Sequence, residues 1–188
     1  MALNAVLGSS TADSYITVAE ADAIFASSFQ ASDWDGYTEA DKEIALKVST
    51  VNLEYLQWNG TRCSPSTDDA GLPQALAWPR NDYECRGLVA TCASIPVPIK
   101  QACAYLALDI AKDPGSISGG GTSGTQGPIK MQQLGSLKQE FFEPGGSDTK
   151  VSPGAPLVLQ KYPYLVDVLG CWLETSTSSS RVILRVRS

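Results

Sequence analysis

The segment from Ile95 to Asp113 constrains the fold more than any other part of the chain. It begins with two prolines, Pro96 and Pro98, which the first turn of a helix tolerates. Apolar residues then recur with the period of one helix face, namely Ile99, Ala102, Cys103, Leu106, Ala107 and Ile110. Such a stripe is typical of a helix that packs on a core. We therefore expect one long core helix here, ended by the Pro-Gly pair after Asp113.

Two capping signals predict earlier helices. Thr17 and Glu20 have the spacing of a capping box, so a helix should begin after Thr17 and run to residue 30, followed by a turn at 33–36. Thr38 and Asp41 repeat the spacing, and the second helix should end near a C-cap at Gly60. Its expected core stripe consists of Ile44, Ala45, Val48, Val51, Asn52, Tyr55 and Leu56.

The rest of the chain alternates between punctuated and patterned segments. Residues 61–94 look irregular because prolines and glycines interrupt them, with Leu76 and Trp78 expected to anchor the loop in the core. Residues 129–134 and 136–142 predict two short strands, and Pro163 should split a helical region at 157–173.

These elements predict a mainly α fold, a four-helix-bundle-like body with a small β-hairpin and a C-terminal extended strand or tail. Residues 1–174 would form the helical domain and residues 175–188 the tail. The domain includes the glycine-rich stretch 115–127, read as a flexible linker or surface loop, and the hairpin 129–142. The tail alternates as a strand does, through Arg181, Val182, Ile183, Leu184, Arg185, Val186 and Arg187.

Charge is distributed unevenly along the chain. The net charge is −6, and residues 1–60 contain nine acidic and two basic residues, a balance of −7. An acidic body is poorly suited to neutralising phosphates. The last eight residues carry three arginines and no acid, which suits contact with an acidic partner or with DNA.

Residue types exclude most catalytic and metal-binding designs. Histidine is absent, so no Ser-His-Asp or Cys-His arrangement can form, and no phosphate-binding loop motif is present. The five cysteines show no C-x-x-C spacing that would indicate zinc. We expect no enzyme activity, no cofactor and no metal.

Most of the cysteines are expected to be structural. Cys103 and Cys171 fall on apolar helix faces and read as core residues. Cys85 and Cys92 flank a loop and would form a disulfide only in an oxidising medium. No apolar run is long enough to span a bilayer, and the N-terminus does not resemble a signal peptide, so the expected product is cytoplasmic and not membrane-bound.

Several sequence blocks occur in the order of one phage protein family. They are residues 12–22, 74–80 and 95–100, the hairpin segment 129–142, and the Tyr-Pro pair at 162–163. With these blocks the chain resembles a tailed-phage family that carries two labels. One label is the head–tail connector or neck adaptor, a helical protein that forms a ring of twelve copies beneath the portal. The other is a DnaT-like single-stranded-DNA-binding protein. The resemblance implies no catalytic residues.

The acidic N-terminal part favours the adaptor label at this stage. A ring around sliding DNA is helped by like charge, whereas a single-strand binder needs a basic groove with aromatic platforms. We therefore expect a structural virion protein, made in the host cytoplasm and located in the neck. Its partners would be its own copies, the portal, a tail or tail-completion protein, and genomic DNA passing through. The seven tail residues listed above are the expected portal-binding segment. The alternatives are a DnaT-like accessory protein or a tail-completion or terminator ring.

Overall fold

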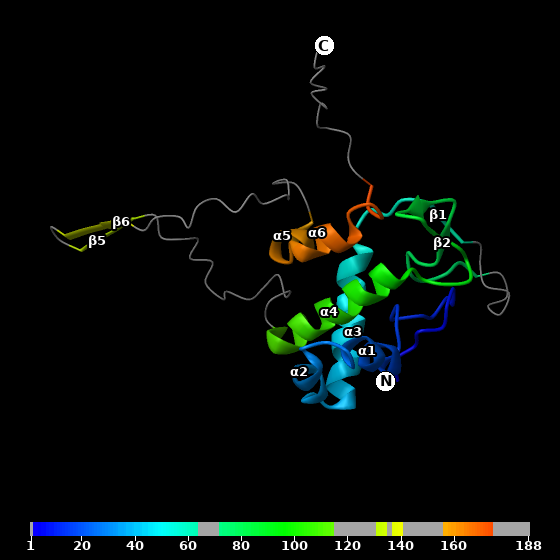
Figure 1. The fold of residues 1–188 in the computed structure, drawn as a ribbon, viewed down its shortest axis with the longest axis horizontal. Helices are drawn as coiled ribbons and strands as arrows, with labels where there is room; N and C mark the ends of the chain where they lie inside the picture. Colours follow the sequence, from blue (N-terminus) through cyan, green and yellow to red (C-terminus); the bar gives the residue numbers. More distant parts are fainter. Residues whose placement is uncertain (1, 64–71, 115–130, 135–136, 141–155, 175–188) are drawn as a thin grey trace, which may run out of the picture.

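The structure, a computed structural model, describes residues 2–63, 72–114, 131–134, 137–140 and 156–174. The helices are α1 (Val18–Phe25), α2 (Ala31–Asp35), α3 (Glu39–Glu54), α4 (Val97–Lys112), α5 (Leu157–Lys161) and α6 (Tyr164–Leu169). The strands are β1 (Thr61–Arg62), β2 (Arg80–Asn81), β3 (Glu84–Cys85), β4 (Leu88–Val89), β5 (Met131–Leu134) and β6 (Leu137–Glu140). Figure 1 shows α3 and α4 packed together at the centre, with α1 and α2 towards one end and α5 and α6 towards the other.

The long helix expected after Pro96 is confirmed as α4. All six residues of its predicted stripe are buried, from Ile99 at the start to Ile110 near the end. The helix ends at Lys112, and the next residue, Asp113, has left helical geometry. Because this face is continuous, α4 supplies the wall against which α3, α1 and α6 pack.

The core face predicted for α3 is wrong at three of its seven positions, although Ala45 and Leu56 are buried as predicted. Ile44, Val51 and Tyr55 are 61%, 52% and 73% exposed, while Ser49 and Thr50 are fully buried. The Ser49 hydroxyl donates to the carbonyl oxygen of Cys103 on α4 at 2.7 Å. Two small, hydrogen-bonded side chains let the helices approach closely, and this tertiary contact overrides the apolar pattern.

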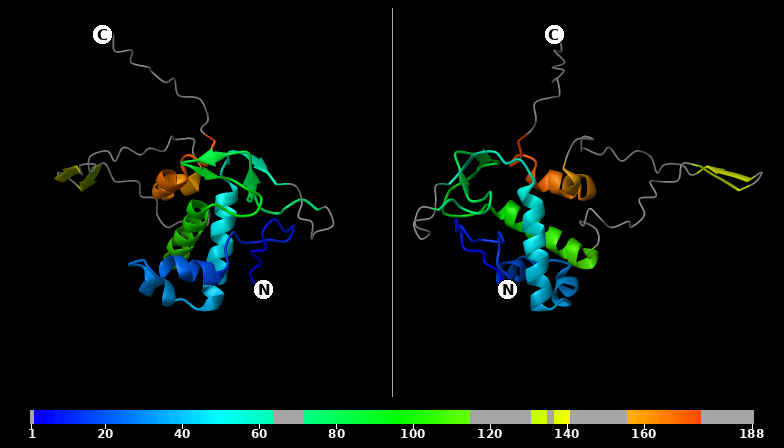
Figure 2. Two further views of the ribbon diagram at one scale, coloured as in Figure 1. Left: turned by 45° about the vertical axis from the view of Figure 1, so that its right-hand side comes forward. Right: turned by 180° about the vertical axis from the view of Figure 1, so that it is seen from behind.

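The four-helix bundle is also wrong. Two long helices cross, and four short ones cover their ends, as the two views of Figure 2 show. The segment expected to be irregular contains two small antiparallel sheets, β1 with β2 and β3 with β4. Gly60 does not cap α3, whose C-cap is Tyr55. It instead adopts φ +82°, and a Cβ there would lie 2.6 Å from the carbonyl oxygen of Asn81.

The first helical region divides earlier than predicted. α1 ends at Phe25, and the expected turn at 33–36 is largely helix α2. Trp34 is the cause, because its buried ring lies 5.1 Å from that of Phe25 and its indole nitrogen donates to Asp22 at 2.7 Å. The capping box of Thr17 and Glu20 is confirmed.

The short strands predicted at 129–142 are confirmed as an antiparallel pair, β5 with β6. The break at Pro163 is confirmed as well, since it separates α5 from α6. The glycine-rich stretch at 115–127 and the tail from Arg181 to Arg187 lie outside the described residues, so their predicted roles stay predictions.

Three tryptophans pack together where the segment after α3, the loop before β2 and the segment after α6 meet. The ring centroid of Trp78 lies 5.7 Å from that of Trp58 and 5.6 Å from that of Trp172, both edge-on. An isolated antiparallel bridge also joins Trp58 to Leu173. This cluster fixes the segment after α6 against the end of α3, and Trp78 anchors its loop as predicted.

The cysteines pair in an unexpected way. Disulfides join Cys63 with Cys92 and Cys85 with Cys171, so the anticipated Cys85–Cys92 pair is wrong and Cys171 is not a free core thiol. Cys103 is the free, buried cysteine of the described chain, as predicted. Burial raises the pKa of its thiol.

Candidate functional site

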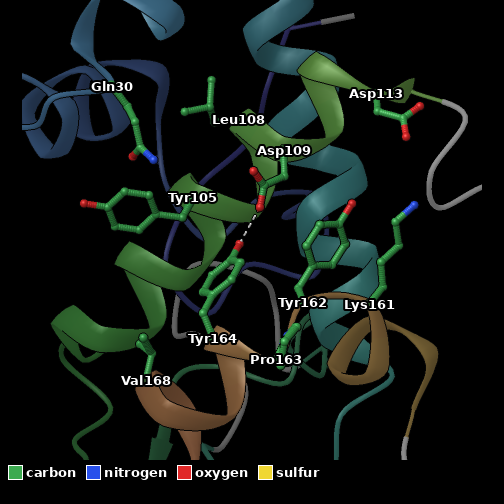
Figure 3. A pocket seen from close by; sticks show the side chains of 10 residues that line it. All are labelled: Gln30, Tyr105, Leu108, Asp109, Asp113, Lys161, Tyr162, Pro163, Tyr164 and Val168. Carbon is green, nitrogen blue, oxygen red and sulfur yellow. Dashed lines mark hydrogen bonds between the residues drawn. The ribbon is translucent and has the colours of Figure 1, made fainter. Parts of the chain in front are cut away.

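A pocket of about 650 Å³ opens beside the C-terminal half of α4. Its size falls in the range of ordinary small-ligand sites. It is lined by Gln30, Tyr105, Leu108, Asp109, Asp113, Lys161, Tyr162, Pro163, Tyr164 and Val168. Figure 3 shows α4 on one side of the pocket and the α5–α6 connection facing it. Three of the lining side chains are tyrosines, which makes this an aromatic site.

Pro163 places two of the tyrosines. Proline lacks a backbone donor and ends α5, so Tyr162 and Tyr164 flank the break on either side. Their ring centroids lie 6.2 Å apart at an interplanar angle of 69°. Tyr162 is 9% exposed and Tyr164 is half-buried, so both rings are held by packing while facing the pocket.

Helix α4 supplies the opposite side. Tyr105 and Asp109 are four residues apart and so lie along one face of α4, and Asp113 follows directly after the helix ends. The Tyr105 ring rests edge-on against Phe25 of α1 at 5.4 Å. This backing fixes the position of the ring, because an edge-on aromatic contact is a favourable geometry.

Asp109 connects the two sides. The Tyr164 hydroxyl donates to Oδ2 of Asp109 at 2.9 Å, the dashed line in Figure 3. Burial, followed by the negative charge of Asp109 and this hydrogen bond, raises the pKa of Tyr164 far above its ordinary value. The phenol therefore stays protonated and keeps donating, which orients the carboxylate in the pocket.

Lys161 brings a positive charge to the site. Its side chain is exposed, and Nζ lies 5.8 Å from the centroid of the Tyr162 ring. A cation at this distance from an aromatic face interacts with it favourably. The site thus combines aromatic rings, carboxylates and an exposed ammonium, a set that suits a flat, polar heteroaromatic ligand attached to an anion.

Ion pairs run through the N-terminal part of the body, which comprises the loop before α1, helices α1 to α3 and the parts of α4 that pack on them. Four lysines each contact a carboxylate at 2.6–3.0 Å, in the pairs Lys42–Asp22, Lys47–Asp13, Lys100–Glu20 and Lys112–Asp33. The four acidic partners all precede residue 34. Part of the acidic excess noted in the sequence therefore neutralises these lysines in the folded protein. We call this region the acidic face.

Other kinds of site find no support in the part of the chain that the structure covers. No cluster of histidine, cysteine, aspartate or glutamate there could hold a metal ion. Nor is any helix among the described residues long and apolar enough to cross a membrane. The expectations of no enzyme activity and no cofactor stay predictions.

The sequence did not single out this pocket. The predicted site residues Arg181, Val182, Ile183, Leu184, Arg185, Val186 and Arg187 lie outside the described residues, so the structure does not test them. Two signals could have indicated the pocket. One is the spacing of Tyr105 and Asp109 beside the core stripe, and the other is the Tyr-Pro-Tyr sequence at 162–164.

Comparison with known proteins identifies one family. A sequence model of the family described as "Putative DnaT-like ssDNA binding protein" matches residues 2–185. No curated protein and no solved structure matches the chain. The family description corresponds to one of the two labels expected from the sequence blocks. None of the comparisons names a head–tail connector.

Proposed function

The chain belongs to the family described as "Putative DnaT-like ssDNA binding protein", and on that premise we propose that it binds single-stranded DNA by taking an unstacked base into the tyrosine-lined pocket. The observation that carries the proposal is the grouping of Tyr105, Tyr162 and Tyr164 around one opening, with Lys161 beside them.

Tyrosine faces suit a ligand whose bases are exposed. Bases of single-stranded DNA stack on aromatic side chains, and each stacked base contributes about 1–3 kcal/mol. A base in a duplex is covered on both faces and is not accessible in this way. The pocket therefore favours single strands over double strands on geometric grounds.

Charge sets the orientation of the strand. Asp109 and Asp113 would repel a phosphate inside the pocket, so the base must enter and the backbone must stay outside. Lys161 is exposed at the same opening and can meet a phosphate there. The lysines of the acidic face are already ion-paired. Binding should thus depend on stacking more than on phosphate contacts.

The proposal is tested by fluorescence anisotropy with a labelled single strand of about ten nucleotides. Tyr164→Ala should weaken binding about 5- to 150-fold, equivalent to one lost stacking contact. Tyr55→Ala is the matched control, because Tyr55 is 73% exposed on α3 and does not line the pocket. Equal effects of the two substitutions, or no binding by the wild-type chain at low salt, would contradict the proposal.

Salt dependence tests the role of Lys161. Each phosphate contact on a single strand contributes about 0.7 to the slope of log affinity against log salt. Lys161→Ala should lower that slope by about 0.7, whereas Lys161→Arg, which keeps the charge, should leave it unchanged. An unchanged slope in the alanine variant would remove Lys161 from the binding site.

The neck adaptor remains a second candidate, favoured by the acidic face. In this proposal twelve copies form a ring in the virion neck, the acidic surface lets genomic DNA slide past, and the residues from Arg181 to Arg187 contact the portal. Cosedimentation with portal rings tests it, with saturation expected near one copy per portal subunit. Deletion of residues 176–188 should abolish that association. Both candidates are binding functions and need no catalysis.

A further inference from the structure

The Asp109 carboxylate lines the aromatic pocket, and one of its two oxygens accepts a hydrogen bond. Its Oδ2 accepts from Tyr164, and no described residue donates a hydrogen bond to Oδ1. In Figure 3 the Asp109 carboxylate lies at the hydroxyl end of the Tyr164 ring, on the α4 side of the pocket. A flat ligand stacked on the Tyr164 ring would therefore turn one of its edges towards this carboxylate.

A carboxylate distinguishes bases because it can only accept hydrogen bonds. Cytosine, adenine and guanine each carry an exocyclic amino group that can donate to it, and aspartate is a known partner of the cytosine N4 amino group. Thymine has no amino group. Its carbonyl oxygens O2 and O4 lie on both sides of its ring N–H and repel a carboxylate.

We propose that Asp109 selects the bound base, accepting a hydrogen bond at Oδ1 from an exocyclic amino group and disfavouring thymine. This inference rests on the proposed function and adds a base preference to it. Tyr164 acts as a positioning residue in two ways, since its ring offers a stacking surface and its hydroxyl holds Oδ2. The other aspartate at the pocket, Asp113, is exposed at the end of α4 and is not held in this manner.

The test compares oligodeoxycytidine with oligodeoxythymidine of equal length by fluorescence anisotropy at neutral pH. The wild-type chain should bind the cytidine strand about tenfold more tightly. Asp109→Asn should reduce the difference to about twofold or less, because an amide both donates and accepts and can serve either base. Asp35→Asn removes the same charge from an exposed site on α2 outside the pocket, so it is the matched control and should keep the tenfold preference.

A change in the ligand tests the same contact without altering the protein. Cytosines methylated twice at N4 have no amino hydrogen left to donate. A strand of such bases should lose the roughly tenfold advantage on the wild-type chain, and it should differ little from ordinary cytidine on Asp109→Asn. A similar loss on both proteins would indicate that the methyl groups act by bulk, and it would overturn the inference.

The outcomes separate the two proposals. Equal affinity of the wild-type chain for both strands, or a cytidine preference that persists in Asp109→Asn, overturns the role of Asp109 and leaves single-strand binding intact. No measurable binding of either strand overturns the proposed function and this inference together.

Discussion

The acidic face and the aromatic pocket differ in how their charged side chains are partnered, although α4 contributes residues to both. Near its start, Lys100 is paired with Glu20 at 2.6 Å and its charge is neutralised. Near its end, Tyr105 and Asp109 project into an open pocket beside Lys161. In the proposed function, a strongly acidic protein accepts a nucleic acid because bases enter the pocket and phosphates stay outside.

The two regions also differ in what their contacts contribute to stability. An ion pair exposed on both sides, such as Lys112–Asp33 in the acidic face, contributes about 0–1 kcal/mol. The pocket is built on buried aromatic and apolar residues, among them Leu165 and Leu169 of α6, whose burial contributes several times more. Substitutions of buried residues should therefore lower stability more than substitutions in exposed ion pairs.

Removing the Trp172 ring from the tryptophan cluster should have the largest effect on stability. Trp172 is 1% exposed and stacks edge-on against Trp78. Trp172→Ala should lower the free energy of unfolding by about 3–5 kcal/mol, measured by urea denaturation. Trp172→Phe keeps an aromatic ring and should cost clearly less. Similar losses in both variants would show that the edge-on ring contact contributes little.

Removing the disulfide between Cys63 and Cys92 should separate stability from binding. The bond closes a loop between residues 29 apart in sequence, and replacing both cysteines with serine should cost about 3–4 kcal/mol in thermal or urea unfolding. Neither cysteine lines the pocket, so affinity for single-stranded DNA should not change under conditions where the variant is folded. A loss of affinity in the folded variant would connect this loop to the site.

The capping box of α1 gives a smaller, pH-dependent effect. Glu20 is partly desolvated, which raises its pKa, but its hydrogen bonds to Lys100 and Thr17 outweigh this and lower the pKa below 4.5. Because the folded-state value is lowered, the stabilisation is present above the unfolded pKa and is lost as pH falls through the folded pKa. Glu20→Gln should therefore cost about 1 kcal/mol at neutral pH, and this cost should shrink as the pH falls through the lowered pKa of Glu20. Urea denaturation over a series of acidic pH values measures the cost, and a difference that stays constant with pH would contradict this origin.

The exposed pair between Lys112 and Asp33 should give the smallest change in stability. Asp33→Asn should alter the free energy of unfolding by less than about 1 kcal/mol, because both side chains are solvated. Released Lys112 can then meet a phosphate, so the salt slope of DNA binding should become steeper by up to about 0.7. Adding Lys112→Gln to Asp33→Asn should restore the original slope. If neither change alters the slope, ion pairing does not keep Lys112 from contacting DNA.

The sequence predicted helices better than it predicted faces. The α4 stripe was correct because each of its six positions from Ile99 to Ile110 is buried in the core. The α3 stripe was wrong because Ser49 and Thr50 are buried by hydrogen bonds to residues far away in the chain. Periodicity counts apolar side chains and has no means of recognising a polar residue that finds its partner across a helix interface.

The pocket was beyond sequence reasoning for a related reason. Each of its sides is readable alone, as Pro163 between two tyrosines and as Tyr105 with Asp109 one turn apart. Their convergence depends on α6 packing against α4, which the Trp172 cluster and the bridge from Trp58 to Leu173 bring about. No local pattern records that packing.

The buried thiol of Cys103 is a built-in reporter of local opening, because its labelling rate depends on how readily the helices around it separate. Ser49 and Thr50 cover its sulfur at 3.4 and 3.5 Å, so a thiol reagent can reach it only while α3 and α4 are apart. The labelling rate divided by the rate for an exposed thiol is then the equilibrium constant for separation of the two central helices, and its logarithm gives the free energy of that opening. A ligand that binds on α4 and favours the packed arrangement of α3 and α4 should lower the labelling rate of Cys103 as its occupancy rises. This measurement needs no fluorescent label on either molecule.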